Sequence, residues 1–168
     1  MRGRMTAIAA FVLCTLLPRA RAAAQLLDVY GSSAQVTATR STFFGFGAGL
    51  SSIWAPGDKF FLRARLGGDY LHEQHLGRVW SSGTLDVSIA PPVFGDSFMW
   101  YAGAGTSLNW SGGESSEWVG ARHGVSAFTG IAFEFGESPL GAHIEERFGY
   151  IMGTDHTLTT RVGVLLRL

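Results

Sequence analysis

Two short stretches of the sequence contain the residue types that hydrolytic enzymes use. Ser126 follows His123 by three residues, and His143 and Glu145 lie further along the chain. A serine, a histidine and a carboxylate can act as nucleophile, general base and orienting group when they come within hydrogen-bond distance. Both stretches alternate between apolar and polar residues, which predicts strands, and residues three apart lie on opposite faces of a strand. The spacing therefore disfavours a hydrolytic site, which would need a β-bulge between His123 and Ser126.

Charged residues on one face of the predicted strands form a second candidate site. Arginines and carboxylates are matched in number, and buried charges have to be paired. We therefore predict a network of ion pairs and hydrogen bonds that fills the interior, with His143 as a further hydrogen-bonding group. The alternative is a narrow or gated ion path. The predicted members are Arg63, Arg65, Asp69, Asp86, Glu134, Glu145, Arg147 and Arg161.

Eight alternating segments position these residues. Most are about 10 to 13 residues long, as a tilted membrane-crossing strand requires. Compact turn sequences such as 55–58 alternate with polar and mostly longer connections such as 111–123, a pattern typical of an up-and-down barrel. We predict an all-β fold, an eight-stranded antiparallel up-and-down transmembrane β-barrel. The predicted strands are Leu26–Gln35, Thr42–Trp54, Phe60–Leu71, Val79–Ala90, Phe98–Trp110, Gly124–Phe135, Gly141–Met152 and Thr157–Leu168.

Aromatic residues indicate which strand face is outside. On the apolar face they gather near the strand ends, and small or aliphatic residues occupy the middle, which matches the two interfaces of a bilayer. Glycines gather on the polar face, as a narrow lumen requires. Glu146 is an exception on the apolar face, and an interfacial position, a bulge or a different register would each account for it. The predicted belts comprise Trp54, Phe60, Trp100, Phe133 and Phe135 near the short turns, and Phe44, Tyr70, Trp110 and Tyr150 near the long loops.

The last predicted strand alternates up to the final residue. Val162, Val164, Leu166 and Leu168 share an apolar face. Soluble domains seldom end in this way, because chain termini usually fray into water. The segment resembles the C-terminal signal strand of bacterial outer-membrane barrels, with Leu168 where that family usually has Phe. The resemblance implies recognition by the barrel-assembly machinery through Arg161, Gly163, Leu166 and Leu168.

The first residues predict export from the cytoplasm. Arg2 and Arg4 precede an apolar run over 7–17, and Ala22-Ala23-Ala24 fits a cleavage site, which together are typical of a secretory signal peptide. We expect residues 1–24 to be a cleaved signal peptide and residues 25–168 to form one domain. The only cysteine, Cys14, lies in the predicted leader, so the domain has no disulfide or thiol chemistry. We expect neither a cofactor nor a metal.

The composition narrows the partners. The formal net charge is zero, which argues against nucleic acid. Beyond the leader no stretch approaches 18 apolar residues, so no transmembrane helix is expected. The balance of glycine and aromatic residues suits a membrane barrel and also a secreted β-sandwich.

Over nearly all of residues 25–168, the chain resembles the small barrel domains of the OmpA, OmpX and opacity-protein type. This resemblance implies a non-enzymatic, porin-like barrel in the outer membrane of a Gram-negative cell envelope, in contact with outer-membrane lipids. A structural or adhesion-like role would follow, with a surface ligand held by the loops, the 111–123 loop above all. Two alternatives stay open: a lipid A-modifying barrel enzyme resembling the deacylases, and a soluble secreted β-barrel that binds an apolar ligand with its aromatic face inward.

Overall fold

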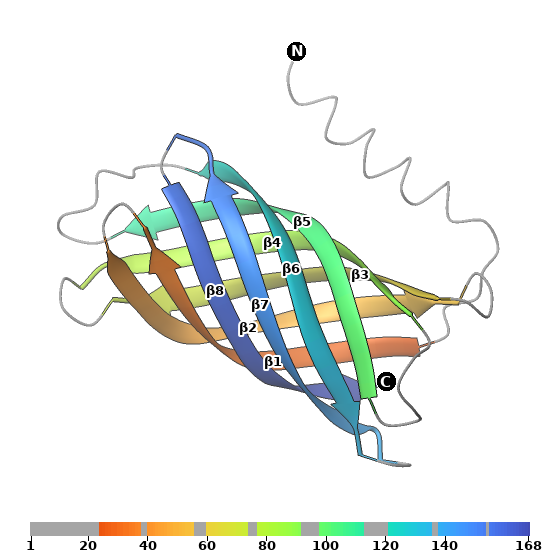
Figure 1. The fold of residues 1–168 in the computed structure, drawn as a ribbon. Coiled ribbons are helices and arrows are strands. Elements are labelled where there is room, and N and C mark those ends of the chain that lie inside the picture. Colours follow the sequence, from red (N-terminus) through yellow and green to blue (C-terminus); the bar gives the residue numbers. More distant parts are fainter. Residues whose placement is uncertain are drawn as a thin grey trace.

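Eight antiparallel strands close into a single barrel in the computed structural model (Figure 1). The structure describes residues 24–37, 40–55, 60–73, 77–91, 98–112, 121–135, 138–153 and 155–168. The strands are β1 (Ala24–Val36), β2 (Ser41–Trp54), β3 (Phe61–His72), β4 (Val79–Ala90), β5 (Phe98–Gly112), β6 (Arg122–Glu134), β7 (Leu140–Ile151) and β8 (Asp155–Arg167). The predicted signal peptide falls, apart from Ala24, on residues outside this described part.

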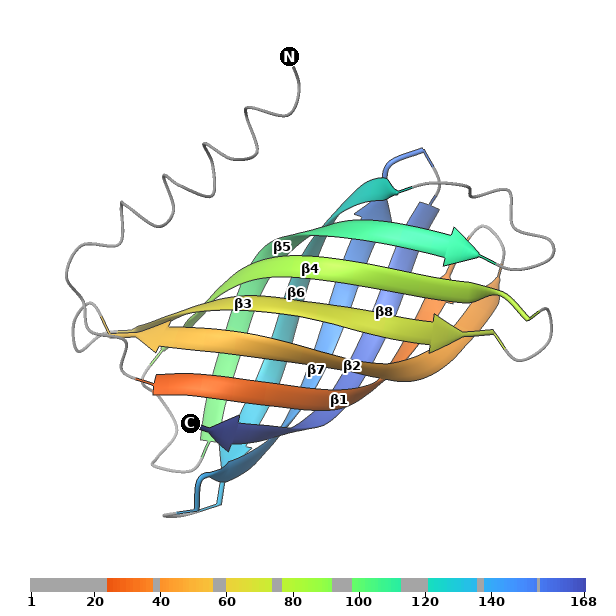
Figure 2. The same cartoon turned by 180° about the vertical axis from the view of Figure 1, so that it is seen from behind.

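Each strand pairs with its neighbour in the sequence, and β8 pairs with β1 to complete the circle (Figures 1 and 2). The closure register places Leu27 opposite Leu166 and Tyr30 opposite Gly163. The predicted eight-stranded antiparallel barrel is therefore confirmed. Among the described residues no helix has the length and apolar character needed to cross a membrane.

The two ends of the barrel are distinguished by the direction of the strands. The odd-numbered strands β1, β3, β5 and β7 end, and the even-numbered strands begin, at one end of the barrel, here called the loop end. The start of β1 and the end of β8 lie at the opposite end (Figures 1 and 2). We call this the terminal end. Leu168 is held there by a backbone hydrogen bond from its N–H to the carbonyl of Gln25, at 3.0 Å.

Burial alternates along the strands, as the period-two pattern predicts. In β7, His143, Glu145 and Arg147 are buried, whereas Ile144 and Phe148 are exposed. In this part of the barrel the inner surface is thus charged and the outer surface largely apolar. This is the reverse of a soluble protein, in which apolar side chains form the interior.

Large inward side chains lie opposite glycines. A Cβ on Gly130 would lie 2.5 Å from the Tyr101 hydroxyl, and a Cβ on Gly103 would lie 2.6 Å from the Phe128 ring. In so narrow a barrel an inward ring leaves no room for a side chain on the facing strand. The inward glycines therefore allow the interior to be filled by a few large groups.

The variant Gly130→Ala is expected to lose about 1–3 kcal/mol of unfolding free energy through overpacking against Tyr101. Gly83→Ala is the matched control, because a Cβ there would meet nothing nearer than the Trp110 ring at 4.0 Å. Urea unfolding in detergent micelles, followed by tryptophan fluorescence, measures both variants. Equal stability of the two variants would contradict this account of the interior.

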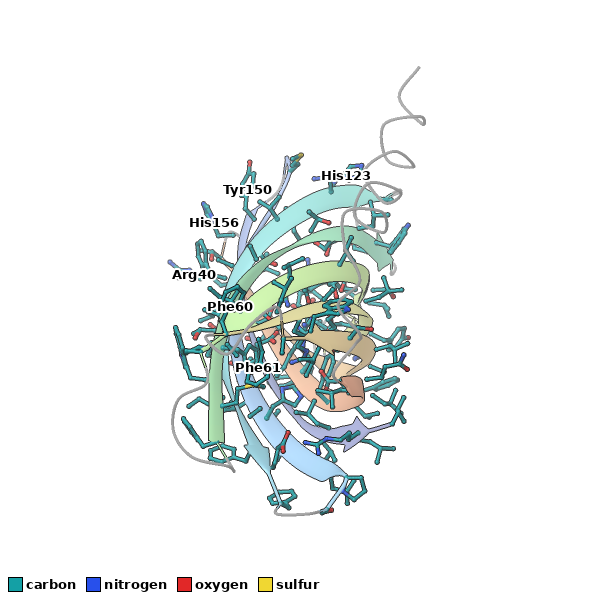
Figure 3. The ribbon with its side chains drawn as sticks, turned by 90° about the vertical axis from the view of Figure 1, so that its right-hand side faces the viewer. Arg40, Phe60, Phe61, His123, Tyr150 and His156 are labelled. Atoms are coloured by element: carbon teal, nitrogen blue, oxygen red, sulfur yellow. The ribbon has the colours of Figure 1, made fainter. Side chains whose placement is uncertain are left out.

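The nine aromatic residues of the predicted belts all lie near strand ends. Eight are exposed on the outer wall, and Trp54 is half-buried. Figure 3 shows Tyr150 and His156 pointing away from the wall at the loop end. His156 stacks on Phe148, with the ring centroids 5.5 Å apart. Aliphatic side chains such as Leu66 and Val29 are exposed between the two ends.

Candidate functional site

Charged side chains from five strands meet inside the barrel. Arg63, Arg65, Arg147 and Arg161 face Asp28, Asp69, Asp86 and Glu145, and each of the eight side chains is at least nine-tenths buried. We call these eight residues the lumen network. Its formal charges cancel, which is the condition for keeping so many ions out of water.

Glu145 on β7 is the centre of the lumen network. Its Oε1 accepts hydrogen bonds from Arg65 at 2.8 Å, from Arg147 at 3.1 Å and from Arg161 at 3.2 Å. Its Oε2 accepts one from the Tyr101 hydroxyl at 3.2 Å. One carboxylate thus connects three guanidinium groups that come from β3, β7 and β8.

Within the lumen network, two arginine–carboxylate pairs have the two-bond geometry that favours arginine over lysine. Arg147 donates to both oxygens of Asp86, at 2.8 and 2.7 Å. Arg161 likewise donates to both oxygens of Asp69. These bonds join β7 to β4 and β8 to β3, across the barrel rather than along its wall.

Asp28 on β1 belongs to the lumen network although it was not among the predicted residues. It lies 3.3 Å from Arg65 and 3.6 Å from Arg63. His143 lies beside it, with Nε2 2.7 Å from Oδ1 but without the alignment of a hydrogen bond. The sequence did carry a signal for Asp28, because this carboxylate alternates with the outward Leu27 and Val29.

Glu134 is the one predicted member that lies elsewhere. It is the last residue of β6, exposed at the terminal end, where it pairs with the exposed Arg167 at 2.6 Å. An inward side chain at the end of a strand is in contact with water, so the charge of Glu134 needs no buried partner. Asp28 takes its place in the balance of four arginines and four carboxylates.

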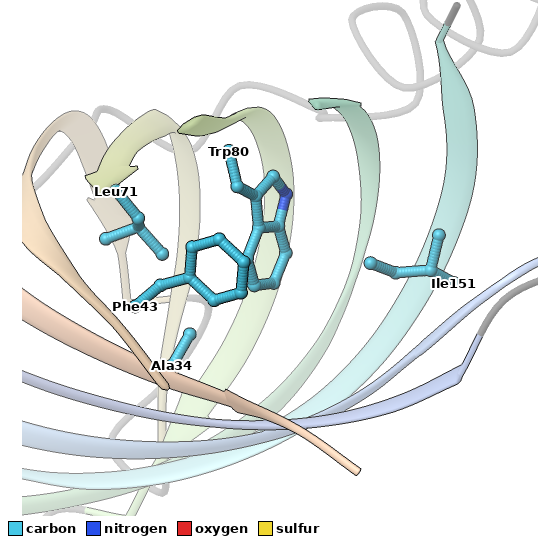
Figure 4. Packing of buried hydrophobic residues seen from close by; sticks show 5 residues of the cluster. All are labelled: Ala34, Phe43, Leu71, Trp80 and Ile151. Carbon is cyan, nitrogen blue, oxygen red and sulfur yellow. The ribbon is translucent and has the colours of Figure 1, made fainter. Parts of the chain in front are cut away.

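Apolar clusters cap the lumen network on both sides. At the loop end, the Phe43 and Trp80 rings meet edge to face at 5.8 Å, beside Ala34, Leu71 and Ile151 (Figure 4). Towards the terminal end lies a second cluster, formed by Ala90, Tyr101, Phe128, Ala132 and Leu165. The guanidinium carbon of Arg147 lies 4.5 Å from the centroid of the Phe128 ring, so the network and this cluster are in direct contact.

A cavity of about 40 Å³ remains between the lumen network and the loop-end cluster. Trp80 and Ile151 line one side, and Arg147 and Arg161 line the other. The Thr84 hydroxyl and the Arg147 Nε are buried without a hydrogen-bond partner among the described groups, and both residues line the cavity. The space suits a small number of water molecules.

The residues with hydrolase chemistry are not brought together. His123 is exposed near the loop end (Figure 3), whereas the neighbouring Ser126 is half-buried and its Oγ accepts a hydrogen bond from Arg147 at 2.8 Å. The β5–β6 register runs through both positions, and pairs Ser126 with Gly105 and His123 with Leu108. His143 and Glu145 lie with the lumen network. Within the described residues no cluster of His, Cys, Asp or Glu could hold a metal ion.

The last strand closes the barrel with the residues of the predicted assembly signal. Arg161 is buried in the lumen network, and Gly163 faces Tyr30 across the closing pair. Leu166 is half-buried and Leu168 is exposed. Apart from Leu165, the inner face of the strand is thus polar or small, and its outer face is mostly apolar.

Several solved structures have the same architecture as this chain. Neisserial surface protein A matches with a TM-score of 0.57 and 17% identity, over 86% of this chain and 96% of that one. Ail, the attachment invasion locus protein of Yersinia pestis, matches with a TM-score of 0.61 and 11% identity, over 86% and 97%. The fold is that of the small outer-membrane β-barrels. The outer membrane enzyme PagL has the same fold, with a TM-score of 0.53 and 12% identity over 83% and 98%.

These likenesses establish the fold alone. No protein-family model matches the chain, and no curated protein sequence does. An enzyme shares the outer-membrane barrel fold with surface proteins, so the fold assigns no role by itself. The role has to be argued from the interior and the wall of this barrel.

Proposed function

We propose that this protein is an integral outer-membrane barrel with a closed lumen, which acts through its wall and its loops. The observation that carries the proposal is the filled interior. The lumen network lies between two apolar clusters, and a cavity of only about 40 Å³ lies beside it. Such an interior stabilises the barrel and offers no wide path to ions.

The outer wall supports placement in a membrane. Exposed apolar side chains occur on all eight strands, among them Leu66, Phe46 and Val162. So large an apolar surface is unfavourable in water, and a bilayer is the solvent that fits it. On this proposal the chain is exported through the predicted signal peptide and assembled through its last strand.

The two alternative functions receive less support. A carrier of apolar ligands would need a cavity of several hundred Å³ with apolar walls, whereas this interior is charged and filled. A lipid A-modifying hydrolase would need His123 within reach of Ser126, and the two side chains differ in exposure and face. These observations favour a non-enzymatic protein.

The loops are the proposed site of contact with a surface ligand. Ail, which shares the fold, has been crystallised in complex with the heparin analogue sucrose octasulfate. By analogy we propose an adhesion-like or structural role at the cell surface for this chain. Much of the 111–123 loop lies outside the described residues, so this part of the proposal rests on the fold.

The decisive experiment separates cells that express the full chain into soluble and membrane fractions. We expect the protein in the outer-membrane fraction, with a gel mobility in SDS that changes on boiling, because a folded barrel resists SDS at room temperature. Purified protein is expected to give no channel currents in planar bilayers. A soluble protein without a mobility shift would overturn the proposal, and steady currents would overturn the closed lumen.

A further inference from the structure

A carboxyl group lies on the apolar outer wall, halfway along β7. Glu146 is exposed, and its neighbours on the same face of the strand, Ile144 and Phe148, are exposed apolar residues. β7 runs from Leu140 to Ile151, so Glu146 is close to its middle. The outward position of Glu146 is thus far from both interfaces of a membrane that the barrel spans.

The register around Glu146 is regular. Glu145, Glu146 and Arg147 pair in order with Gly130, Thr129 and Phe128 of β6, and in order with Arg161, Thr160 and Thr159 of β8. The adjacent carboxylates therefore point to opposite sides, Glu145 into the lumen network and Glu146 outward. A bulge or a shifted register does not explain the position of Glu146.

Polar residues continue from Glu146 across four neighbouring strands. Thr129 of β6 lies opposite Glu146, Glu146 lies opposite Thr160 of β8, and Thr160 lies opposite Ser33 of β1. These strands run side by side in Figure 1. We call Ser33, Thr129, Glu146 and Thr160 the polar row. On β7 and β8 the exposed neighbours of the row on the outer face, among them Ile144, Phe148 and Val162, are apolar.

The described residues use only part of the hydrogen-bonding capacity of the Glu146 carboxyl group. The Thr160 hydroxyl donates to Oε1 at 2.8 Å, and the described residues provide no further hydrogen bond to this side chain. Ionisable groups that face hydrocarbon are costly, and they mark functional positions. A partner that supplies polar groups at this depth would reduce that cost.

We propose that the polar row is a self-association surface, on which a second copy of this chain packs within the membrane. The inference rests on the proposed membrane location. A two-fold interface requires a surface that is complementary to itself. The polar row combines hydroxyl groups with a carboxyl group whose Oε2 accepts no hydrogen bond from the described part of the chain. Gly31 and Ala127, on the outer face beside the row, carry little or no side chain and allow two walls to approach closely.

Sedimentation equilibrium of the purified full chain in density-matched neutral detergent micelles tests the proposal. We expect a reversible dimer. Glu146→Leu should weaken dimerisation about tenfold or more, because two-fold symmetry removes the contact twice. Glu146→Gln keeps a hydrogen-bonding group and should stay within about threefold of the original chain. Removing a lipid-facing charge does not harm the barrel, so both variants are expected to show the mobility shift on boiling.

A matched pair of threonine variants controls for position. Thr160→Val removes a hydroxyl of the polar row, and Thr106→Val removes an exposed hydroxyl on β5, outside the row. Only Thr160→Val should weaken the dimer. A monomer that still shows the mobility shift would overturn the polar-row inference and leave the membrane proposal intact. Equal dimerisation of Glu146→Leu, or equal weakening by both threonine variants, would also overturn it.

Discussion

Glu145→Leu is expected to lower the free energy of unfolding by about 3–5 kcal/mol, the usual effect of removing one partner from a buried ion pair. Glu145 contacts Arg65, Arg147 and Arg161. Without it, four buried arginines would face three carboxylates in an interior that is shielded from water at both ends. Chemical unfolding in lipid vesicles, followed by tryptophan fluorescence, gives the change in free energy.

Two controls separate charge balance from lost packing. Glu146→Leu removes the neighbouring carboxylate from the outer wall and should leave the stability of the monomer unchanged or higher. The double variant Arg65→Met with Glu145→Leu removes one charge of each sign and so restores equal numbers of charges. Arg147 still pairs with Asp86, and Arg63 with Asp28. It should recover at least half of the loss. A loss below about 1 kcal/mol in Glu145→Leu would mean that the network contributes no stability.

Val164→Arg is expected to cost about 1–3 kcal/mol, because Val164 lies between the middle of β8 and its terminal end, and the cost of a lipid-facing cation falls from the bilayer midplane towards the interfaces. Val164 is exposed on β8, opposite Val29 of β1 and Ala142 of β7. The folded fraction after refolding into vesicles, read from the mobility shift on gels, and the unfolding free energy both report the effect.

The matched control for Val164→Arg is Met152→Arg, which puts the same cation on an exposed residue just beyond the loop end of β7. Near an interface the expected cost is only about 0–1 kcal/mol. If both variants insert and fold like the original chain, the outer wall does not face lipid. A difference that follows depth identifies the hydrocarbon layer.

Strand positions could be predicted from the sequence because alternation with a period of two is a local signal. The fourth strand has the predicted limits, Val79–Ala90, and no limit of any strand differs from the prediction by more than two residues. The aromatic and glycine patterns also predicted which face points inward. Each of these properties depends on neighbours along one strand.

The partners within the lumen network could not be predicted in the same way. Which arginine meets which carboxylate depends on the stagger between strands and on contacts across the barrel, such as Arg65 with Glu145. Glu134 was correctly predicted to lie on the inward face of its strand. Because β6 ends at this residue, its side chain is exposed to water and does not join the network. Asp28 lies in β1 between aliphatic residues, where a single carboxylate gives a weak pattern.

The cross-barrel bonds have a consequence for the order of folding. Arg161 and Asp69 are 92 residues apart in the chain, and Arg65 and Glu145 are 80 apart. No hairpin can form these bonds alone, so they appear only when β8 meets β1 and the circle closes. Separation of β1 from β8 would in turn move Asp28 and Arg161 away from their ion-pair partners on other strands. The barrel should therefore close late in folding. Separation of β1 from β8 should be slow, which gives the folded state a long lifetime.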